Sequence, residues 1–187
     1  MQEKNLLRKK FYSLRKKKYF EINSSFFIPF INLIKSKFKK NKIKLALYYP
    51  ASYEINVIKL LELKFISNQS LLLPVIEENN IMNFYPWKKN EVLQVNKYGM
   101  LEPIKSKNNV PDVMMVPLLV FDKDKYRLGY GKGFYDRYLN KYLKKFKNIL
   151  TVGVAFSFQK HHKLPSNNKD VKMNYIITEK GIYWWSY

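Results

Sequence analysis

The sequence predicts an α/β protein, built as a single three-layer α/β/α domain with a mostly parallel central sheet. Three observations favour this fold class: a length of 187 residues, apolar segments in the order strand, helix, strand, and a glycine-rich turn ahead of a helix. A chain of this length buries enough surface to fold as one unit. We therefore expect one domain over residues 1–187, with ligands binding at the carboxyl ends of the parallel strands.

The first two elements are expected to be helices, over residues 2–20 and 24–39. In the first helix, Leu7, Phe11 and Leu14 recur at helical spacing and form an apolar stripe. Directly beside that stripe lies a basic one, made of Lys4, Arg8 and Arg15. Since charged stripes usually face solvent, the simplest interpretation of the basic stripe is a solvated flank at the rim of the core.

The middle of the chain carries a strand–helix–strand pattern. We expect a strand over residues 43–49, a helix over 54–65 and a second strand over 71–75, followed by weaker strands and polar turns over 78–110. This order is typical of a parallel sheet whose faces are covered by helices.

The second half of the chain contains an apolar segment, residues 113–121, which is expected to be a buried central strand. Pro117 lies within it and requires a strand end or an irregularity, because proline donates no backbone hydrogen bond. Further strands are expected over residues 149–156 and 175–178. The helix that follows the glycine-rich turn has an apolar stripe made of Tyr135, Leu139, Tyr142 and Phe146.

Charge is the strongest feature of the composition. Lys and Arg number 35 against 14 Asp and Glu, which gives a formal net charge of +21 and an isoelectric point near 9.9. Such a surplus favours polyanionic ligands, which include nucleic acid, an anionic membrane surface and small acidic molecules.

Several function classes are excluded by residues that the sequence lacks. It contains no Cys, which rules out disulfides, thiolate zinc sites and a Cys nucleophile. Its two histidines, His161 and His162, are neighbours and do not form a spaced histidine metal site. The longest strongly apolar stretch, residues 26–34, is too short to span a bilayer. We therefore expect a cytoplasmic protein without a membrane partner.

The glycine-rich turn is the clearest candidate for a ligand site. Gly129, Gly131 and Gly133 alternate with other residues, so the backbone can approach a ligand closely and present N–H groups to phosphate oxygens. Arg127 and Lys132 can neutralise phosphate charge. The spacing is neither that of a P-loop nor that of a dinucleotide fingerprint. From the spacing alone, a turn that merely ends a strand is as consistent as a phosphate site.

Residues 127–139 resemble the signature of the 5-formyltetrahydrofolate cyclo-ligase family, also called 5,10-methenyltetrahydrofolate synthetases. Other pieces of the family pattern follow in the expected order between residues 4 and 178, and the ordered set is more specific than any piece. They are Lys4 with Leu7-Arg8, Tyr49 with Glu54, Pro74, Met82 with Phe84, Glu102-Pro103, Asp112 to Pro117, Phe121-Asp122, Gly153 to Phe156, Gln159, Leu164-Pro165 and Asp170.

The resemblance implies an α/β/α fold and a reaction that depends on ATP and Mg²⁺. The substrate would be 5-formyltetrahydrofolate, and the products 5,10-methenyltetrahydrofolate, ADP and phosphate. In the family's mechanism the formyl oxygen takes the γ-phosphoryl group, N10 attacks the imidate carbon, and phosphate leaves. Phosphoryl transfer depends mostly on positioning and charge neutralisation, so the lack of a Cys nucleophile is consistent with this chemistry.

The resemblance also implies roles for individual residues. Arg127 and Lys132 would be catalytic, and Asp136 and Asp170 would hold Mg²⁺. The ATP-binding residues would be Lys4, Arg8, Arg127, Leu128, Gly129, Tyr130, Gly131, Lys132, Gly133, Phe134 and Tyr135. The substrate-binding residues would be Tyr49, Glu54, Tyr130, Gly131, Lys132, Gly133 and Phe134.

Simpler interpretations stay open for some of these positions. Asp136 and Asp170 are also consistent with a helix cap or a surface carboxylate. Glu54 is also consistent with the N-terminal turn of a helix. Met82, Phe84 and Trp87 are consistent either with a wall of the folate pocket or with packing in the core.

The chain departs from the family pattern at three positions. Leu118 stands where Gly is usual, Lys169 where His is common, and Phe134 where Tyr is frequent. None of these residues belongs to the proposed phosphate or Mg²⁺ ligands, so we expect activity to survive.

Two other functions are consistent with the sequence. A nucleic-acid-binding protein would explain the charge of +21 and the 17% aromatic residues, but the basic residues fall in several separate runs. A diverged paralogue would keep the ATP site and act on another substrate. We expect the partners to be ATP and a folate, with no specific nucleic acid, and the chain to be a monomer or a weak homodimer.

Overall fold

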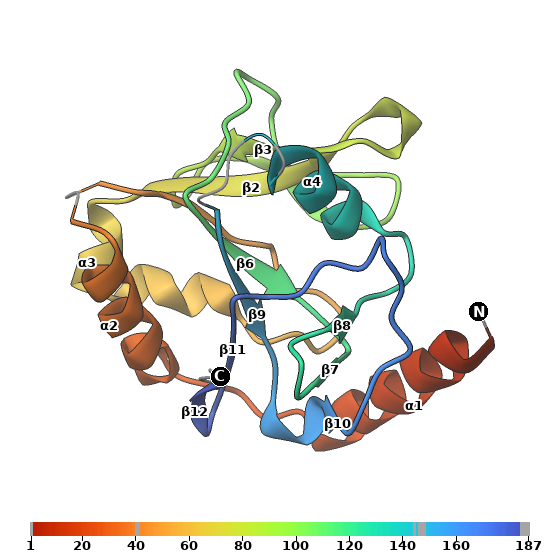
Figure 1. Ribbon diagram of the computed structural model, residues 1–187. Helices are drawn as coiled ribbons and strands as arrows, with labels where there is room; N and C mark the ends of the chain where they lie inside the picture. The colour runs from red at the N-terminus through yellow and green to blue at the C-terminus, as the bar shows by residue number, and fades with distance from the viewer. Residues whose placement is uncertain (1, 40–41, 144, 146–148, 184–187) are drawn as a thin grey trace.

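The structure is a computed structural model that describes residues 2–39, 42–143, 145 and 149–183. Within these residues a seven-stranded sheet has the order β12-β11-β9-β6-β1-β2-β3 (Figure 1). Strands β2, β1, β6, β9 and β11 run parallel, while β3 and β12 pair antiparallel at the edges. The bounds are β1 Lys44–Ala46, β2 Ser70–Ile76, β3 Met82–Pro86, β6 Val113–Pro117, β9 Leu150–Val154, β11 Tyr175–Thr178 and β12 Gly181–Tyr183.

One face of the sheet is covered by α2 (Ile28–Lys37) and α3 (Lys64–Ser67), together with the 3-10 helices η1 (Ser24–Phe27) and η2 (Val57–Glu62) (Figure 1). Burial of apolar surface is what fixes these elements to the sheet. The buried cluster on this face includes Phe27, Phe30, Leu45, Leu60 and Val152.

The opposite face is covered by α4 (Phe134–Leu143), which Figure 1 shows on the other side of the sheet from α2 and α3. Tyr138 and Leu139 are buried there, and Tyr135 and Tyr142 pack against the same cluster. Phe146 of the predicted stripe lies outside the described residues. With helices on both faces and a mostly parallel sheet, the predicted fold class is confirmed.

Helix α1 (Gln2–Lys18) packs on a small three-stranded sheet among the described residues, of order β10-β7-β8. These strands are β7 (Val120–Asp122), β8 (Arg127–Leu128) and β10 (Lys160–His161). Phe11 is buried against this sheet, and Leu7 and Leu14 pack beside it, so the predicted apolar stripe is confirmed. This placement brings α1 to the end of the molecule toward which β6 points (Figure 1).

The region 78–110, expected to hold weak strands, contains the 3-10 helix η3 (Glu78–Asn80) and the hairpin of β4 (Leu93–Val95) and β5 (Leu101–Pro103). The buried carboxylate of Glu102 ties this hairpin to the main sheet. It accepts hydrogen bonds from the backbone N–H of Ile76 at 3.2 Å and from Asn96 Nδ2 at 2.9 Å.

The prediction of one helix over 54–65 is wrong. Instead η2 and α3 are separated by Leu63, whose backbone is extended. Within η2 the two buried residues, Val57 and Leu60, are three positions apart, which suits a 3-10 helix because residues i and i+3 are aligned in it.

The predicted strand over 113–121 is divided at Pro117. Strand β6 ends there, and β7 begins at Val120 in the small sheet. Between them, the Leu119 N–H bonds to the Leu128 carbonyl at 2.8 Å, outside the main sheet. The irregularity expected at this proline is therefore a change of sheet. A last 3-10 helix, η4 (Ser157–Gln159), follows β9.

Candidate active site

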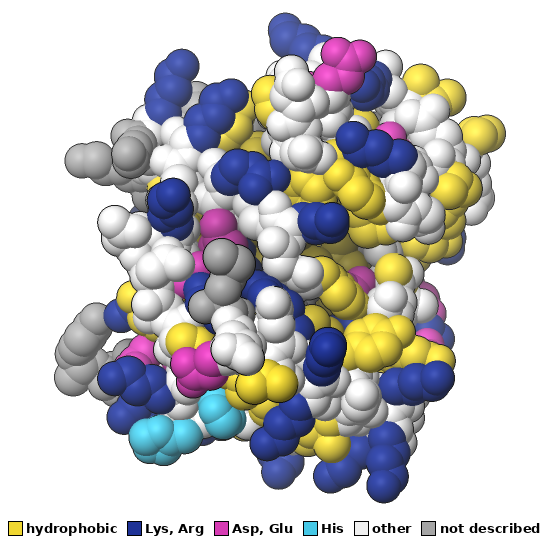
Figure 2. Space-filling model, turned by 90° about the vertical axis from the view of Figure 1, so that its right-hand side faces the viewer, with side chains coloured by type: hydrophobic (Ala, Val, Ile, Leu, Met, Phe, Trp, Pro, Cys, Tyr) yellow, Lys and Arg dark blue, Asp and Glu magenta, His cyan; other side chains and the backbone are white. Residues whose placement is uncertain are grey.

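A cavity of about 520 Å³ lies at the carboxyl ends of the central parallel strands. Pro117 at the end of β6, Tyr48 after β1 and Ile76 at the end of β2 border it. Figure 2 views the molecule from this side and shows apolar side chains in a hollow, with Lys and Arg side chains spread around it. A cavity therefore lies at the edge of the sheet where the predicted topology favours ligand binding.

The glycine loop, residues 129–133, forms one wall of this cavity between β8 and α4. Gly131 and Gly133 have φ of +94° and +67°, a left-handed conformation that favours glycine. Arg8 from α1 lies on this loop: its Nε donates to the Gly129 carbonyl at 2.9 Å. A Cβ atom at Gly131 would lie only 3.1 Å from Arg8 Cζ. Two of the glycines thus let a basic side chain and the backbone meet closely.

Two ion pairs lie beside the glycine loop. Lys4 Nζ contacts Asp170 Oδ2 at 2.6 Å, and Arg127 Nη2 contacts Asp136 Oδ1 at 3.1 Å. Arg127 is nearly buried, and burial lowers the pKa of its guanidinium, against the attraction of Asp136. Lys4, Arg8, Arg127, Asp136 and Asp170, which are far apart in the sequence, are therefore brought together.

Asp136 and Asp170, each paired with a basic side chain, are of the residue type that could supply the protein ligands of a Mg²⁺ ion. Both Asp136 and Asp170 line the cavity, and no group of three or more His, Asp or Glu side chains suited to a metal occurs among the described residues. Mg²⁺ is commonly bound by one or two carboxylates, substrate phosphates and water, so a pair of carboxylates is sufficient.

Glu54 is a buried carboxylate that also lines the cavity, and its side chain hydrogen-bonds to Tyr130 of the glycine loop. Its Oε2 accepts the Ala51 N–H at 2.9 Å, within a turn in which Ser52 and Tyr53 have positive φ. Burial raises the pKa of Glu54 to about 7, and the hydrogen bond from Ala51 and the attraction of Arg15 oppose that rise. The interpretation of Glu54 as the first turn of a helix is wrong, since η2 begins only at Val57.

Tyrosines surround this carboxylate. Tyr48, Tyr130 and Tyr135 line the cavity, and burial followed by the repulsion of Glu54 raises the pKa of each hydroxyl, that of Tyr130 to about 12. These hydroxyls therefore stay protonated near neutral pH and act as hydrogen-bond donors.

The basic stripe predicted on α1 is only partly a solvated flank. Lys4 and Arg8 lie at the cavity as described, and Arg15 is 1% exposed. The simple interpretation is wrong for Arg15, because the small sheet and the glycine loop cover this side of the helix. Periodicity alone locates a stripe without showing what packs on it.

Residues of the β4–β5 hairpin also line the cavity, although no motif in the sequence indicates this. They are Asn96, Tyr98, Gly99, Met100 and Leu101. The Tyr98 ring lies 5.7 Å from the Phe134 ring and 5.8 Å from Lys132 Nζ, measured to its centroid. Gly99, with a φ of +73°, marks the tight turn in the sequence, but the position of that turn over the glycine loop depends on the tertiary fold.

Arg137 is a second contributor that the sequence did not indicate. Its Nη1 donates to the Lys132 carbonyl at 2.7 Å, and its Nη2 donates to the Asn80 carbonyl at 3.0 Å. It therefore braces the glycine loop against the segment that precedes β3.

The remaining predicted positions divide between site and core. Tyr49 and Met82 line the cavity, whereas Phe84 is fully buried in the core beneath α4. Trp87 is buried in the cluster on the opposite face. Core packing is thus the correct interpretation for Phe84 and Trp87, whereas Met82 both packs in the core and lines the cavity.

The three departures from the family pattern lie in different surroundings. Leu118 is buried over Gly153, where a Cβ atom would lie 2.9 Å from Leu118 Cδ2, so the absence of a side chain at 153 provides the room. The Lys169 side chain is exposed. Phe134 lines the cavity and packs edge-on against Tyr98.

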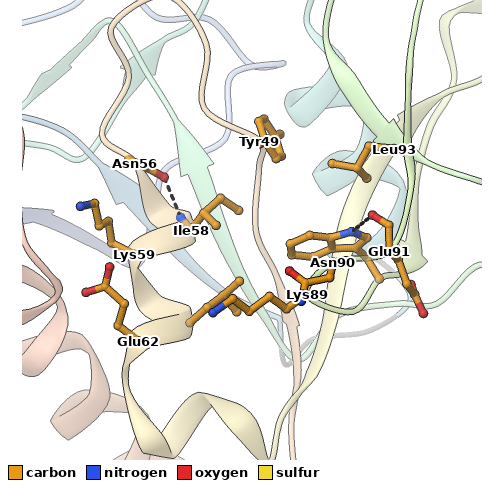
Figure 3. A pocket seen from close by; sticks show the side chains of 11 residues that line it. Tyr49, Asn56, Ile58, Lys59, Glu62, Lys89, Asn90, Glu91 and Leu93 are labelled. Carbon is orange, nitrogen blue, oxygen red and sulfur yellow. Dashed lines mark hydrogen bonds between the residues drawn. The ribbon is translucent and has the colours of Figure 1, made fainter.

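A smaller pocket of about 410 Å³ lies beyond Tyr49, which borders both spaces (Figure 3). Figure 3 shows Lys59 and Glu62 on one wall and Lys89 and Glu91 on the other. Because basic and acidic side chains are balanced here, this pocket is less suited to a polyanion than the cavity beside the glycine loop.

Comparisons with known proteins show which family the sequence is similar to. The model of the 5-formyltetrahydrofolate cyclo-ligase family matches residues 1–179. The 5-formyltetrahydrofolate cyclo-ligase of Haemophilus influenzae is 31% identical over 154 residues, which is 79% of this chain and 80% of that protein. The one from Mycoplasma pneumoniae is 43% identical over 72 residues, 38% of this chain and 42% of its own.

Solved structures give the same result. The 5,10-methenyltetrahydrofolate synthetase of Aquifex aeolicus superimposes with a TM-score of 0.73 at 32% identity, covering 96% of this chain and 91% of that one. The synthetase of Mycoplasma pneumoniae superimposes with a TM-score of 0.69 at 27% identity, covering 95% of this chain and 99% of its own. The resemblance found in the sequence is confirmed, and the chain is an enzyme that belongs to the 5-formyltetrahydrofolate cyclo-ligase family.

Proposed function

We propose that the chain converts 5-formyltetrahydrofolate and ATP into 5,10-methenyltetrahydrofolate, ADP and phosphate. The observation that carries this proposal is the composition of one cavity. Cations and a glycine loop suited to phosphates line it, and so does a buried carboxylate among tyrosines. A reaction between a nucleotide and a folate needs both kinds of wall within one enclosed space.

The glycine loop and its cations would bind the ATP phosphates. Backbone N–H groups of residues 129–133 could donate hydrogen bonds to phosphate oxygens, because glycine has no side chain to keep an anion away from the backbone. Lys4 and Arg8, already adjacent to Asp170 and the Gly129 carbonyl, can turn to phosphate oxygens, and Lys132 is exposed at the loop's tip. With Arg127 nearby, these cations offset the charge that accumulates on the transferring group.

Glu54 would bind the pterin. Its second carboxylate oxygen can accept hydrogen bonds from ring N–H groups, and Tyr49, Tyr130 and Met82 supply flat or apolar surface beside it. Such a buried acceptor favours a ligand that donates, because an unpaired carboxylate in this environment is costly.

Two steps account for the reaction. The formyl oxygen attacks the γ-phosphorus, and the bond from that phosphorus to the bridging oxygen breaks with its electrons going to ADP. The N10 lone pair then attacks the activated formyl carbon, the N10 proton is lost, and the carbon–oxygen bond breaks as phosphate leaves. The protein's part is to hold the formyl oxygen in line with the γ-phosphate and to exclude water.

Mg²⁺ would be held by Asp136 and Asp170 in this proposal, and it would neutralise phosphate charge when bound. The other residues act without it. Lys132 and Arg127 stabilise the charge on the equatorial oxygens, so we propose these two residues as the catalytic ones.

A single spectrophotometric assay tests the proposed function. With Mg²⁺-ATP and 5-formyltetrahydrofolate, the absorbance of the methenyl product should grow, and it should not grow without ATP. Lys132→Ala and Arg127→Ala should each reduce turnover by about tenfold or more. Turnover that persists in both variants would contradict the assigned roles, and an ADP-forming reaction only with another substrate would favour the diverged paralogue.

Small polyanions explain the net charge better than nucleic acid does. Figure 2 shows basic side chains scattered over the cavity face rather than gathered in one stripe. No described helix is long and apolar enough to cross a membrane. We propose a cytoplasmic monomer or weak homodimer without a specific nucleic-acid partner. Tight RNA binding that weakens steeply with salt, without cyclo-ligase activity, would overturn this view.

A further inference from the structure

Arg15 lies behind the cavity and bonds to the segments that form its walls. Its Nη1 donates to the Leu118 carbonyl at 3.0 Å, and its Nη2 donates to the Ser52 carbonyl at 2.8 Å. The same Nη2 contacts the Tyr130 hydroxyl, and the guanidinium carbon is 5.6 Å from the centre of the Tyr130 ring. Arg15 does not itself line the cavity.

Each of its partners belongs to a different part of the site. Leu118 follows β6, Ser52 belongs to the turn that presents Glu54, and Tyr130 belongs to the glycine loop. The Tyr130 ring is 46% exposed, so packing holds it only in part. Ser52 has a φ of +50°, a conformation that persists only where the surroundings impose it. The Tyr130 side chain also hydrogen-bonds to the side chains of Ser52 and Glu54, so the two segments meet at the group that Arg15 contacts.

Stability alone is a weak reason for a buried arginine at this position. Taking a guanidinium out of water is costly, and the Nε of Arg15 has no hydrogen-bond partner among the described residues. The Leu118 carbonyl also accepts from Gln159 Nε2 at 3.0 Å, so it stays bonded without Arg15. An apolar side chain would fill the same space at a lower cost in desolvation.

We propose that Arg15 is a positioning residue that sets the separation between the glycine loop and the 51–54 turn. Its planar guanidinium donates to the Ser52 carbonyl and to the Tyr130 hydroxyl at once, which a lysine or an apolar residue does not reproduce. The phosphate wall and the pterin wall are thereby held at one distance. The inference rests on the proposed function, in which the γ-phosphate and the formyl oxygen must meet between these walls.

The test compares Arg15→Met with Gln159→Met. Gln159 is also buried, donates to the Leu118 and Leu119 carbonyls and accepts from the Phe156 N–H, but it does not border the cavity, so its variant shows the effect of lost buried hydrogen bonds without a change at the cavity wall. Arg15→Met should lower kcat about tenfold or more, because misplaced reactants lose the benefit of proximity. Gln159→Met should stay within about twofold of the unchanged enzyme at a temperature where both are folded.

A double-mutant cycle with Tyr130→Phe tests whether Arg15 acts on turnover through the Tyr130 hydroxyl. If Arg15 acts through the Tyr130 hydroxyl, the double variant should be no slower than Arg15→Met within about twofold. Losses that multiply would overturn the inference, as would kcat unchanged in Arg15→Met or lowered equally in Gln159→Met.

Hydrogen exchange gives a readout that does not require turnover. Amides of residues 52–54 and 129–133 should exchange faster in Arg15→Met than in Gln159→Met, because their shared anchor is lost. Equal exchange in the two variants would contradict the proposal. If the unchanged chain shows no cyclo-ligase turnover, the proposed function fails, and the exchange result still decides whether Arg15 holds these segments.

Discussion

The ammonium group of Lys4 lies 2.6 Å from a carboxylate oxygen of Asp170, a residue 166 positions later in the chain. Both side chains are about one-sixth exposed, so the pair is only partly screened by water. In our proposal Asp170 holds Lys4 close to the place of the ATP phosphates and is released from it when the nucleotide binds. In this proposal Lys4 thus exchanges its contact with Asp170 for a contact with an ATP phosphate when the nucleotide binds.

Lys4→Met should raise KM for ATP by about tenfold, since a hydrogen bond to a charged group contributes about 1.5–3 kcal/mol. Steady-state kinetics over a range of ATP concentrations measures this. Lys9→Met is the matched control, because Lys9 is exposed on the same helix and its substitution removes the same charge. Equal shifts in the two variants would mean that overall charge, rather than the position of Lys4, is what matters.

Gly131→Ala should weaken ATP binding and lower the free energy of unfolding by about 1–2 kcal/mol. The reason is a φ of +94° together with a Cβ atom 3.1 Å from Arg8 Cζ. Thermal unfolding and KM for ATP measure both effects. Gly129→Ala should lower the free energy of unfolding and the affinity for ATP clearly less, because no described atom lies within 4 Å of a Cβ atom at that position and the φ of Gly129 is not left-handed. A reversed order of the two variants would contradict the close approach of Arg8.

Binding of the folate should weaken as the pH falls below 7. Burial raises the pKa of Glu54 to about 7, so its carboxylate becomes protonated in the range where other carboxylates stay charged. A protonated Glu54 accepts fewer hydrogen bonds from the pterin. KM for 5-formyltetrahydrofolate, measured between about pH 6 and 8, should therefore rise at the acidic end. Glu54→Gln should have a higher KM that no longer changes through this range, and a persistent change would assign the titration to another group.

The same group should make the protein more stable toward mild acid. Glu54 has its pKa raised from 4.5 in the unfolded chain to about 7 in the folded protein, so the folded state binds the proton more tightly. Its contribution therefore favours folding below pH 4.5 and is lost as the pH rises through about 7. Urea unfolding at several pH values, compared between the unchanged chain and Glu54→Gln, isolates this contribution. The variant should show the flatter profile over that interval.

Gly153→Ala should destabilise the fold by about 1–3 kcal/mol, as overpacking does. A Cβ atom there would lie 2.5 Å from Ile176 Cδ1 and 2.9 Å from Leu118 Cδ2. Leu118→Ala should recover part of the loss in the Gly153→Ala background, although it lowers stability by itself through a cavity. Chemical denaturation of both single variants and the double variant measures the coupling. Strict additivity would show that Leu118 and position 153 do not compete for the same space.

Much of the architecture follows from local pattern. Strands 71–75 and 175–178 are continuous apolar segments, and they lie in the parallel sheet close to their predicted bounds. The glycine loop was identified from three alternating glycines, because only backbone geometry had to be inferred. The carboxyl ends of the strands then gave the position of the cavity by topology alone.

The failures share a physical cause, which is that burial depends on distant partners. The charge of Arg15 predicts exposure, yet carbonyls more than 30 positions away accept its hydrogens. Residues 54–65 have the composition of one helix, but the extended backbone of Leu63 separates η2 from α3. Tyr98 reaches the site because Glu102 ties its hairpin to β2, a contact between residues that no local pattern connects.

The partners of α1 bear on how the protein is made. Arg15 bonds to Leu118, Arg8 to the Gly129 carbonyl and Lys4 to Asp170, at separations of 103, 121 and 166 positions. During translation the helix is made long before any of these partners. A nascent chain therefore completes the wall that we propose for ATP only when the segment around residue 170 has been made. A partly synthesised chain cannot sequester ATP by this route.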